Sequence, residues 1–392
     1  MKIAHIAPPW IAIPPKNYGG TENVIYTIVE EQIAQGHDVT LFAAGDARTS
    51  ARLVSFFPHS LIGIGTPWQA HLKAYYHTYK AIEYIKSHQF DIVHTHLSSS
   101  ADMYTFPLIS QLTIPMVTTL HSRFPFDREQ AWCGDADNYY MEWMRDVPFI
   151  AISESARAEV TMPIQFAGVV SHGVQMSHFK PSTEEPENYL VWLGRFIPEK
   201  GAHLAIRVAQ ATGLPLIMAG TIDRHVPISV EYFERSIKPQ INGHHIKYIG
   251  PVGMREKVDL LSRARVFLNP IEWEEPFGMV MIEAMAVGCP VISFARGAAP
   301  SIVADGKSGY LVENVEEMIS ALEHIDLLDR KQVRAYVQEN FSAQSMVEKY
   351  IHIYQRVRSA HLLKAARLTR SLTDSIVASI PRHTSNVVSM DH

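Results

Sequence analysis

Two carboxylates, Glu275 and Glu283, stand eight positions apart in the stretch of this chain whose residue types most suggest chemistry. They flank a Pro-Phe-Gly turn that ends at Gly278, and the run after it is rich in Ala and Met and poor in β-branched residues. This run favours a helix that ends near Gly288. We therefore expect Glu275 in a loop just before a helix and Glu283 about two turns inside it.

The N-terminus of such a helix is suited to bind a phosphate group. Its first amides have free N–H groups and a partial positive charge, and Gly278 removes side-chain bulk at that point. The flanking carboxylates repel phosphate, so they would bind something else, most simply sugar hydroxyls. One ligand that carries both groups is a nucleotide sugar. The alternative is that the acids only favour the helix dipole and that Glu283 is a solvated surface residue.

A second stretch supplies positive charge. Arg195 and Lys200 directly follow an apolar run at 189–193 that is typical of a buried strand. Arginine gives a bidentate contact to phosphate and lysine a point charge. Isolated residues of these types usually belong to a solvated loop. Here both follow a strand and would face the 275–283 stretch, which favours a shared anion site.

Near the start of the chain, Gly19 and Gly20 lie between an expected strand at 2–7 and an expected helix at 23–35. In a strand, Gly-Gly loop and helix, backbone amides face a diphosphate, although most Gly-Gly pairs are only turns. Thr21 is expected to cap the first helical turn. The chain has no Gly-x-Gly-x-x-Gly motif, which argues against an NAD-dependent oxidoreductase.

Composition limits the class of protein. A length of 392 residues predicts two domains, because one hydrophobic core rarely grows so large. The net charge of −5 disfavours non-specific binding of nucleic acid. Cys133 and Cys289 offer neither a disulfide framework nor a zinc cluster. We see no signal peptide and no apolar run of the roughly 18 residues that span a bilayer, so we expect a soluble cytoplasmic protein.

Apolar runs alternate with helical segments through both halves of the chain. In the first half, strands are expected at 2–7, 38–44, 91–96, 116–121, 149–153 and 168–170. In the second half, they are expected at 189–193, 215–220, 246–250, 265–270, 290–294 and 309–312. A segment rich in proline and acids, 180–187, reads as a linker. The fold class predicted is α/β, with two doubly wound parallel sheets.

Ligands of such sheets collect outside the carboxyl ends of the strands. Four polar residues of the first half fall at or near these ends: His94, His96, His121 and Ser153. His121 is the best placed contact, with a structural histidine as the alternative. His94 and His96 face one side and could ligate a metal, but no third ligand is evident nearby, so no metal site is expected. Asp135 and Asp137 have the spacing of a cation-binding pair, yet they lie in a loop that favours a solvated turn.

The last part of the chain reads as helices at 315–328, 329–340 and 342–357. From 359 to 392 the chain is polar, with scattered Lys and Arg and a proline at 381. A solvated or disordered tail is the favoured interpretation, and a basic amphipathic helix is the alternative.

With the Gly-Gly loop, the Arg-x-x-x-x-Lys-Gly stretch and the Glu-x7-Glu segment together, the chain resembles a retaining glycosyltransferase of family 4 over roughly residues 1–358. These enzymes have the GT-B architecture, two facing Rossmann-like domains with the active site in the cleft. The resemblance implies an acceptor-side domain at 1–180, a donor domain at 181–341 and a helix at about 342–358 that packs back on the first domain. One departure is His172-Gly-Val-Gln, where members often have Asn-Gly-Val-Asp, and it leaves the role of His172 open.

The resemblance also implies roles for the residues that match. Arg195 and Lys200 would neutralise the donor diphosphate, which the Gly19-Gly20 backbone would approach. Glu275 would hold hydroxyls of the donor sugar. The remaining implied contacts are Glu283 to the ribose, His121 to the sugar near the reacting carbon, and the backbone of Phe277, Gly278, Met279 and Val280 to the sugar and phosphate.

The reaction implied is transfer of a hexosyl group from a nucleoside-diphosphate sugar to a hydroxyl acceptor, with retention of configuration and without a metal or other cofactor. No pair of carboxylates is placed on both sides of the anomeric carbon, so a double displacement is not indicated. A nucleotide-sugar epimerase or a sugar phosphorylase of the same architecture is the enzymatic alternative, and a sugar-nucleotide binding protein the non-enzymatic one. The sequence identifies neither base, sugar, acceptor nor oligomeric state, and its lack of a strong basic or aromatic surface run disfavours membrane lipid.

Overall fold

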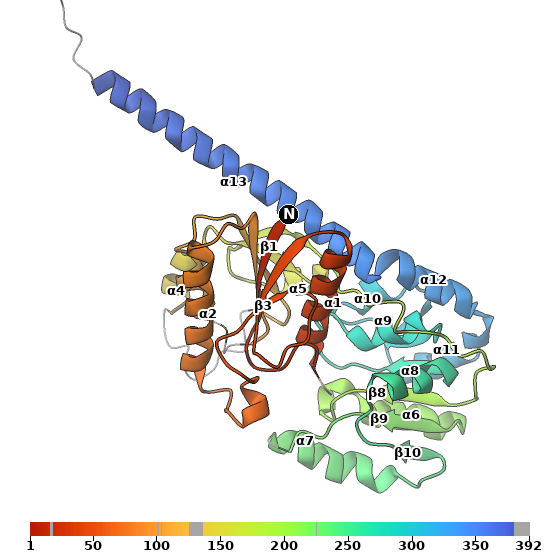
Figure 1. Cartoon of the computed structure of the whole chain (residues 1–392). Helices are drawn as coiled ribbons and strands as arrows, with labels where there is room; N and C mark the ends of the chain where they lie inside the picture. Colours follow the sequence, from red (N-terminus) through yellow and green to blue (C-terminus); the bar gives the residue numbers. More distant parts are fainter. Residues whose placement is uncertain (16–18, 100–101, 103, 125–135, 225, 380–392) are drawn as a thin grey trace, which may run out of the picture.

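The computed structural model describes residues 1–15, 19–99, 102, 104–124, 136–224 and 226–379. Two α/β domains follow one another along the chain, and each is built on one parallel sheet (Figure 1). The fold class predicted from the alternating pattern, two doubly wound Rossmann-like domains, is confirmed.

The sheet of the first domain has the strand order β3-β2-β1-β4-β5-β6-β7. Its strands are β1 (Lys2–Ile6), β2 (Asp38–Phe42), β3 (Arg52–Val54), β4 (Ile92–Leu97), β5 (Met116–Leu120), β6 (Pro148–Ala151) and β7 (Gln165–Val169). Its helices are α1 (Gly20–Ala34), α2 (His71–Lys86), α3 (Thr105–Ile109), α4 (Ala136–Met144) and α5 (Glu154–Ala158). Strand β3 and helices α3 to α5 are short elements that the periodicity did not reveal.

The sheet of the second domain has the order β10-β9-β8-β11-β12-β13. Its strands are β8 (Leu190–Leu193), β9 (Leu216–Ala219), β10 (Ile246–Tyr248), β11 (Val266–Asn269), β12 (Val291–Phe294) and β13 (Gly309–Val312). Its helices are α6 (Ala202–Thr212), α7 (Pro227–Tyr232), α8 (Met254–Arg263), α9 (Met279–Ala286), α10 (Ala299–Ile302), α11 (Val315–Leu322) and α12 (Arg330–Asn340). Every strand expected in this half is present.

Both sheets are covered on two faces, which explains their composition. Helices pack on both faces of each sheet and bury the strands. The strands therefore consist of nearly continuous apolar residues. Strand β4 is buried along its whole length although it contains His94, Thr95 and His96. Buried polar side chains need hydrogen-bonding partners, and the partners in this protein come from neighbouring strands and from the last helix.

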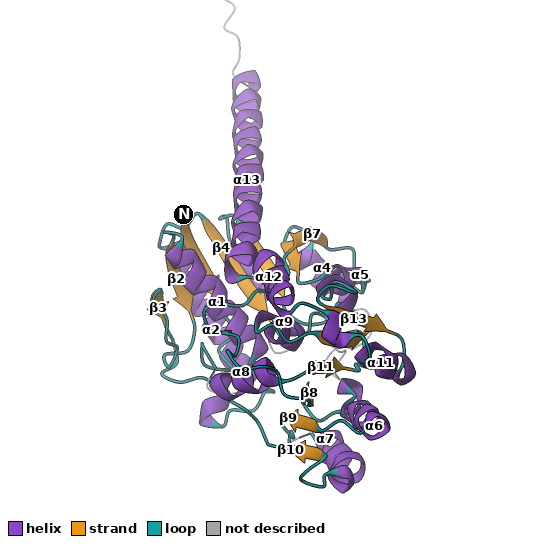
Figure 2. Ribbon diagram, turned by 90° about the vertical axis from the view of Figure 1, so that its right-hand side faces the viewer, coloured by secondary structure: helices purple, strands orange, loops and turns teal. Residues whose placement is uncertain are grey.

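The last helix, α13 (Ala343–Ser379), is longer than expected. Its first part packs on the first domain, where Met346, Tyr350 and Tyr354 join the apolar cluster around Ile3. The sequence predicted an end near 357, but the helix continues to Ser379 and projects from the body of the protein (Figures 1 and 2). Residues 359–379 contain many good helix formers and neither Gly nor Pro, which lets the helix propagate.

The start of α1 also differs from the expectation. The helix begins at Gly20, its N-cap is Gly19, and no side chain caps it. Thr21 therefore lies inside the first turn and does not cap it, because the helix starts three residues earlier than its apolar periodicity indicated. Among the described residues, no helix combines the length and the apolar character that crossing a bilayer requires.

Candidate active site

Lys200 is fixed by the turn that follows β8. The indole Nε1 of Trp192 donates to the Lys200 carbonyl at 3.0 Å. The next residue, Gly201, has φ +68°, and a Cβ there would lie 1.9 Å from the carbonyl oxygen of Pro270. Only glycine permits this approach, so the close packing of the turn on the 270 loop determines where Lys200 points.

Lys200 and Glu275 form an ion pair, which brings together two residues that the sequence placed in one site. The carboxylate also accepts a hydrogen bond from Nε1 of Trp273 at 3.1 Å. The Lys200 ammonium lies 5.3 Å from the centre of the Trp273 ring, within reach of a cation–π contact. The Lys200 and Glu275 side chains are 20% and 15% exposed, so both are held in place yet remain accessible to a ligand.

Both domains hold the loop that carries Glu275. In the second domain, Ala298 N–H donates to the Glu275 carbonyl at 2.9 Å. Gly297 has φ +55°, and a Cβ there would lie 2.4 Å from the Glu275 nitrogen. From the first domain, the Ser153 hydroxyl donates to the Pro276 carbonyl at 2.7 Å. Ser153, expected at a strand end, therefore connects the first domain to this loop.

Helix α9 follows the loop as expected, but it is shorter than the spacing suggested. Gly278 has φ +93° and is the N-cap, so Glu283 lies little more than one turn inside the helix rather than two. Glu283 is buried and accepts from the Lys257 ammonium of α8 at 2.6 Å. The alternative of a solvated Glu283 is therefore wrong. Lys257 was missed because no motif in the sequence surrounds it. The one available signal was that a buried carboxylate needs a cationic partner.

Arg195 lies between β8 and the Lys200 turn, and it is half-buried. Its Nε is buried and has no hydrogen-bonding partner in the described part of the protein. A buried guanidinium donor without a partner costs free energy that an anionic ligand would recover. This orphaned donor fits the expected role of Arg195 toward a diphosphate.

Gly19 and Gly20 open α1 in the first domain. A Cβ on Gly19 would lie 2.8 Å from Cβ of Pro15, so this position needs glycine. A Cβ on Gly20 would meet no described atom within 4 Å, and its backbone is open. The preceding loop residues 16–18 lie outside the described residues.

His121 lies at the boundary between the domains. Its Nε2 is 2.9 Å from Nδ1 of His96, and its ring stacks on His172 at 5.2 Å between centroids. The His172 ring in turn lies 4.8 Å from the ring of Phe277 in the second domain. Burial holds the pKa of His121 well below its ordinary value and lowers that of His172 to about 3, so both rings are neutral. His172, whose role the sequence left open, thus bridges His121 and the 275–278 loop.

The other residues of this loop connect the two cores. Phe277 is buried and its ring lies 6.3 Å from that of Phe341. Met279 packs against the apolar clusters of both domains, and Val280 packs against that of the second. Phe277 is thus enclosed, whereas Gly278, Met279 and Val280 are only half-buried, so a ligand can reach this part of the chain.

The histidine pair His94 and His96 gains a third neighbour, His5 of β1, that the sequence did not reveal. Ligating nitrogens of the three rings lie within 4.8 Å of one another. Every one of their ring nitrogens is already hydrogen-bonded to a protein group. A metal would have to break these bonds, so the arrangement fits a polar network better than a metal centre. Asp135 and Cys133 lie outside the described residues. Asp137 lies in the first turn of α4, so the turn expected at this residue is wrong.

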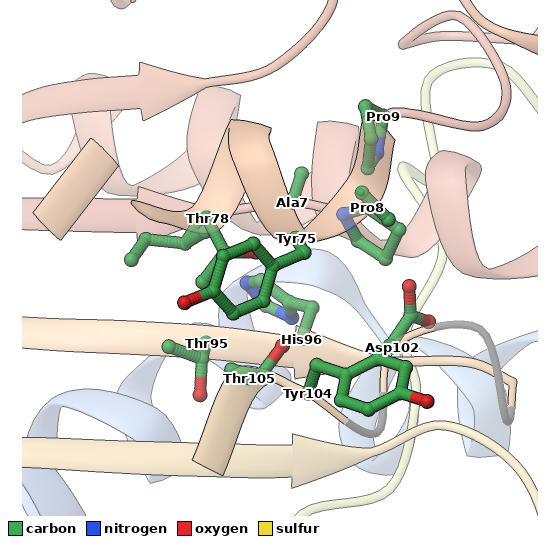
Figure 3. Close-up of a pocket in the computed structure, with 12 residues that line it drawn as sticks. Ala7, Pro8, Pro9, Tyr75, Thr78, Thr95, His96, Asp102, Tyr104 and Thr105 are labelled. Carbon is green, nitrogen blue, oxygen red and sulfur yellow. The ribbon is translucent and has the colours of Figure 1, made fainter. Parts of the chain in front are cut away.

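A small pocket opens in the first domain beside this network (Figure 3). Its lining includes Ala7, Pro8, Tyr75, Thr78, Thr95, His96, Asp102, Tyr104 and Thr105. Asp102 is buried, accepts a hydrogen bond from Trp10 Nε1 at 3.1 Å, and has its pKa raised by burial. Tyr75 and Tyr104 are 38% and 41% exposed. The pocket thus presents aromatic rings together with polar groups, and no sequence pattern indicated it.

The comparisons with known proteins now decide the family. A family model described as glycosyl transferases group 1 matches residues 174–343, and one described as Glycosyltransferase Family 4 matches residues 18–177. The chain belongs to the group 1 glycosyltransferases. Their GT-B architecture is the fold described above.

Individual relatives of this glycosyltransferase are distant. Spore coat protein SA of Bacillus subtilis (strain 168) is 22% identical, with 91% of this chain and 100% of that protein covered. Sucrose-phosphate synthase from Thermosynechococcus elongatus has a TM-score of 0.72 at 20% identity, covering 92% and 99% of the two chains. Anabaena HepE in complex with UDP-glucose has a TM-score of 0.64 at 17% identity, covering 92% and 100%. At these identities, the solved structures show a common fold.

Proposed function

We propose that this glycosyltransferase moves a hexosyl group from a nucleoside-diphosphate sugar to a hydroxyl acceptor, with retention of configuration and without a metal ion. The observation that carries the proposal is the Lys200–Glu275 ion pair beside the N-terminus of α9. It sets a cation, a carboxylate and free helix amides next to one another, which is what a ligand with both phosphates and hydroxyls requires.

The donor would bind mainly to the second domain. Lys200 and the orphaned donor of Arg195 would contact the diphosphate together with the amides that begin α9. Glu275 would accept hydrogen bonds from sugar hydroxyls, and Glu283 would hold the ribose. HepE, which shares this fold, has been solved with UDP-glucose, a ligand of this class.

The acceptor would approach from the first domain. The rings of Tyr75 and Tyr104 are exposed beside the small pocket in Figure 3, so a sugar or another flat apolar face would stack on them from outside the pocket. His121 lies where the first domain meets the 275–278 loop, so a group held there would be close to both substrates.

In the reaction, the bond between the anomeric carbon and the diphosphate oxygen breaks while the acceptor oxygen attacks from the same face. Negative charge grows on the leaving diphosphate, and Arg195, Lys200 and the helix amides stabilise it as preorganised groups. The leaving phosphate oxygen accepts the proton of the acceptor hydroxyl, which balances the transfer. A second carboxylate nucleophile has no part in this scheme.

A thermal-shift panel tests the donor site. Nucleoside diphosphates and their sugars are added to the full chain with and without a chelator, and bound ligand raises the midpoint in proportion to ln(1 + [L]/Kd). We expect one base to give a selective shift that the chelator does not change. A shift that the chelator abolishes would contradict metal independence, and no shift with any nucleotide would contradict the site.

Product analysis with the nucleotide that binds then separates the enzymatic alternatives. A transferase consumes the sugar nucleotide in proportion to a hydroxyl acceptor and yields a glycoside of the donor's anomeric configuration. Conversion of the sugar without any acceptor would instead indicate an epimerase, and an inverted product would contradict retention.

A further inference from the structure

A row of hydrogen-bonded rings crosses the first sheet and ends at the domain boundary. His5 of β1, His96 of β4 and His121 after β5 come from strands that are neighbours in the sheet. The links are Gln32 Oε1 to His5 Nε2 at 2.8 Å, His5 Nδ1 to His96 Nε2 at 2.9 Å, and His96 Nδ1 to His121 Nε2 at 2.9 Å. All four side chains are buried.

The three rings are neutral, and this makes the row directional. Burial lowers the pKa of His5 to about 4 and holds those of His96 and His121 well below 6.5. A neutral imidazole has one N–H donor and one acceptor nitrogen. Each ring must therefore donate on one side and accept on the other, so a group that fixes one end fixes every ring along the row.

Tyr354 of α13 fixes the inner end. Its hydroxyl lies 2.6 Å from Nδ1 of His94, a separation within the range of O–H donors, about 2.5–3.0 Å, and shorter than that of N–H donors. The phenol therefore donates to His94, and its oxygen accepts from Gln32 Nε2 at 3.3 Å. This contact turns the Gln32 carbonyl oxygen toward His5, which must then donate from Nε2.

The same direction follows along the row to its outer end. His5 Nδ1 accepts from His96 Nε2–H, and His96 Nδ1 accepts from His121 Nε2–H. The remaining nitrogen, His121 Nδ1, then carries a lone pair. It is buried and has no hydrogen-bonding partner among the described residues. A buried acceptor without a donor costs free energy, so this nitrogen is suited to meet a ligand.

We propose that Gln32, His5 and His96 are positioning residues that hold His121 protonated at Nε2, so that its Nδ1 accepts a hydrogen bond from a hydroxyl of the sugar bound between the domains. A lone pair cannot bind a phosphate oxygen, which is itself only an acceptor. His121 in this tautomer selects a hydroxyl and leaves the diphosphate to Arg195 and Lys200. The inference rests on the proposed function for the identity of the ligand, whereas the tautomer is a property of the protein alone.

Nitrogen-15 NMR of the full-length protein with labelled histidines reads the tautomers directly. Single substitutions of His5, His96 and His121 by asparagine assign the signals. We expect all three rings to carry the proton on Nε2 and to share a hydrogen-bonded chemical-shift signature near neutral pH. A proton on Nδ1 of His121 in the wild-type protein would overturn the proposal, and so would a charged ring.

Two substitutions, one on α1 and one on α13, remove the contacts that fix the inner end of the row. Gln32→Met keeps the side-chain size but has no accepting oxygen for His5. Tyr354→Phe removes the hydroxyl that accepts from Gln32 Nε2, so the side-chain amide of Gln32 is free to flip. In both variants we expect a mixture of His121 tautomers and a fall in turnover of about tenfold, the size of one misdirected hydrogen bond. Affinity for the nucleoside diphosphate should not change. Gln35→Met is the matched control, because Gln35 is an exposed residue at the end of the same helix and its side chain hydrogen-bonds to Glu31.

The outcomes separate this inference from the proposed function. A wild-type protein that binds no nucleotide would defeat the proposed function while the tautomer measurement still stands. Selective nucleotide binding with His121 protonated at Nδ1 would defeat only the inference. Variants that keep a single His121 tautomer and full turnover would show that Gln32 and Tyr354 do not direct the row. If a variant fails to fold, the wild-type spectrum alone decides.

Discussion

The two domains prepare their shares of the site with opposite chemistry. The second domain uses charged pairs, Lys200 with Glu275 and Lys257 with Glu283, at positions that solvent still reaches in part. The first domain uses neutral rings, among them His96 and His121, that are almost fully buried. The reason is physical, because a charge in the dry interior of a sheet is costly whereas a neutral hydrogen-bonded ring is not.

The difference shows which half of the site can change its hydrogen-bonding partners. Lys200 and Glu275 satisfy each other and both are partly exposed, so each would be able to turn to the phosphate and hydroxyl groups of the proposed donor. The hydrogen-bonding partners of the histidine rings in the first domain permit only one position for the proton on each ring. The charged half can therefore adjust to its ligand, and the neutral half holds a fixed orientation.

The largest effect we expect is loss of stability in mild acid. Six buried histidines have lowered pKa values: His5, His77, His94, His96, His121 and His172. A lowered folded pKa contributes stability that is present above the unfolded value of 6.5 and is lost as the pH falls toward the folded value, about 4 for His5. Each such group changes the free energy of unfolding by up to about 1.4 kcal/mol per pH unit.

Glu22 acts in the opposite sense. Burial raises its pKa to about 7, so its contribution is present below 4.5 and is lost as the pH rises. Asp102, whose pKa burial also raises, acts in the same sense as Glu22. Six groups outweigh these two, and we expect the free energy of unfolding in urea to fall by several kcal/mol between pH 6.5 and about pH 5. Equilibrium unfolding followed at several pH values measures this. A midpoint that stays level or rises over that interval would contradict the neutral, buried state of the rings.

The next largest effect tests the charged half. In the proposed reaction, Lys200→Ala removes a cation from the place where the leaving diphosphate would gather charge, and we expect kcat to fall by about 10²–10³, as for one lost preorganised donor. The unfolding midpoint should change little, because Glu275 keeps its bond from Trp273 and some access to water. Steady-state kinetics and urea unfolding of the same sample measure both.

Lys307→Ala is the control for that substitution, since Lys307 is an exposed lysine of the same domain. It should leave turnover unchanged. A folded Lys200→Ala protein with wild-type turnover would remove Lys200 from the site.

A smaller effect separates structure from ligand binding within the charged half. Lys257→Met leaves the Glu283 carboxylate buried without its cation, and we expect the free energy of unfolding to fall by about 3 kcal/mol. Adding Glu283→Gln removes the unpaired charge and should restore more than half of the loss. Urea unfolding of the two variants measures this, and equal stability of Lys257→Met and wild type would show that the pair is not buried in solution.

Much of the fold and part of the site followed from local sequence patterns. All strands of the two sheets except β3, the loop that holds Glu275 and the helix after Gly278 were predicted, because apolar periodicity and glycine positions report on neighbouring residues. Thr21 was wrongly expected to cap α1, and the chain after 357 was wrongly expected to leave the helix. Both errors concern helix ends, where propensity and periodicity give the weakest signal.

The sequence by itself determined two parallel α/β domains, placed Arg195 and Lys200 after a strand, and placed Glu275 in a loop just before a helix. Only the tertiary structure decided which side chains meet. Lys257 joins Glu283 across 26 positions, His5 joins His96 across 91, and Tyr354 joins Gln32 across 322. Such pairings depend on which strands become neighbours and on where α13 returns, and no local propensity encodes them. The charged residues of the site can thus be identified from sequence motifs, whereas the direction of its neutral hydrogen bonds depends on how the whole chain packs.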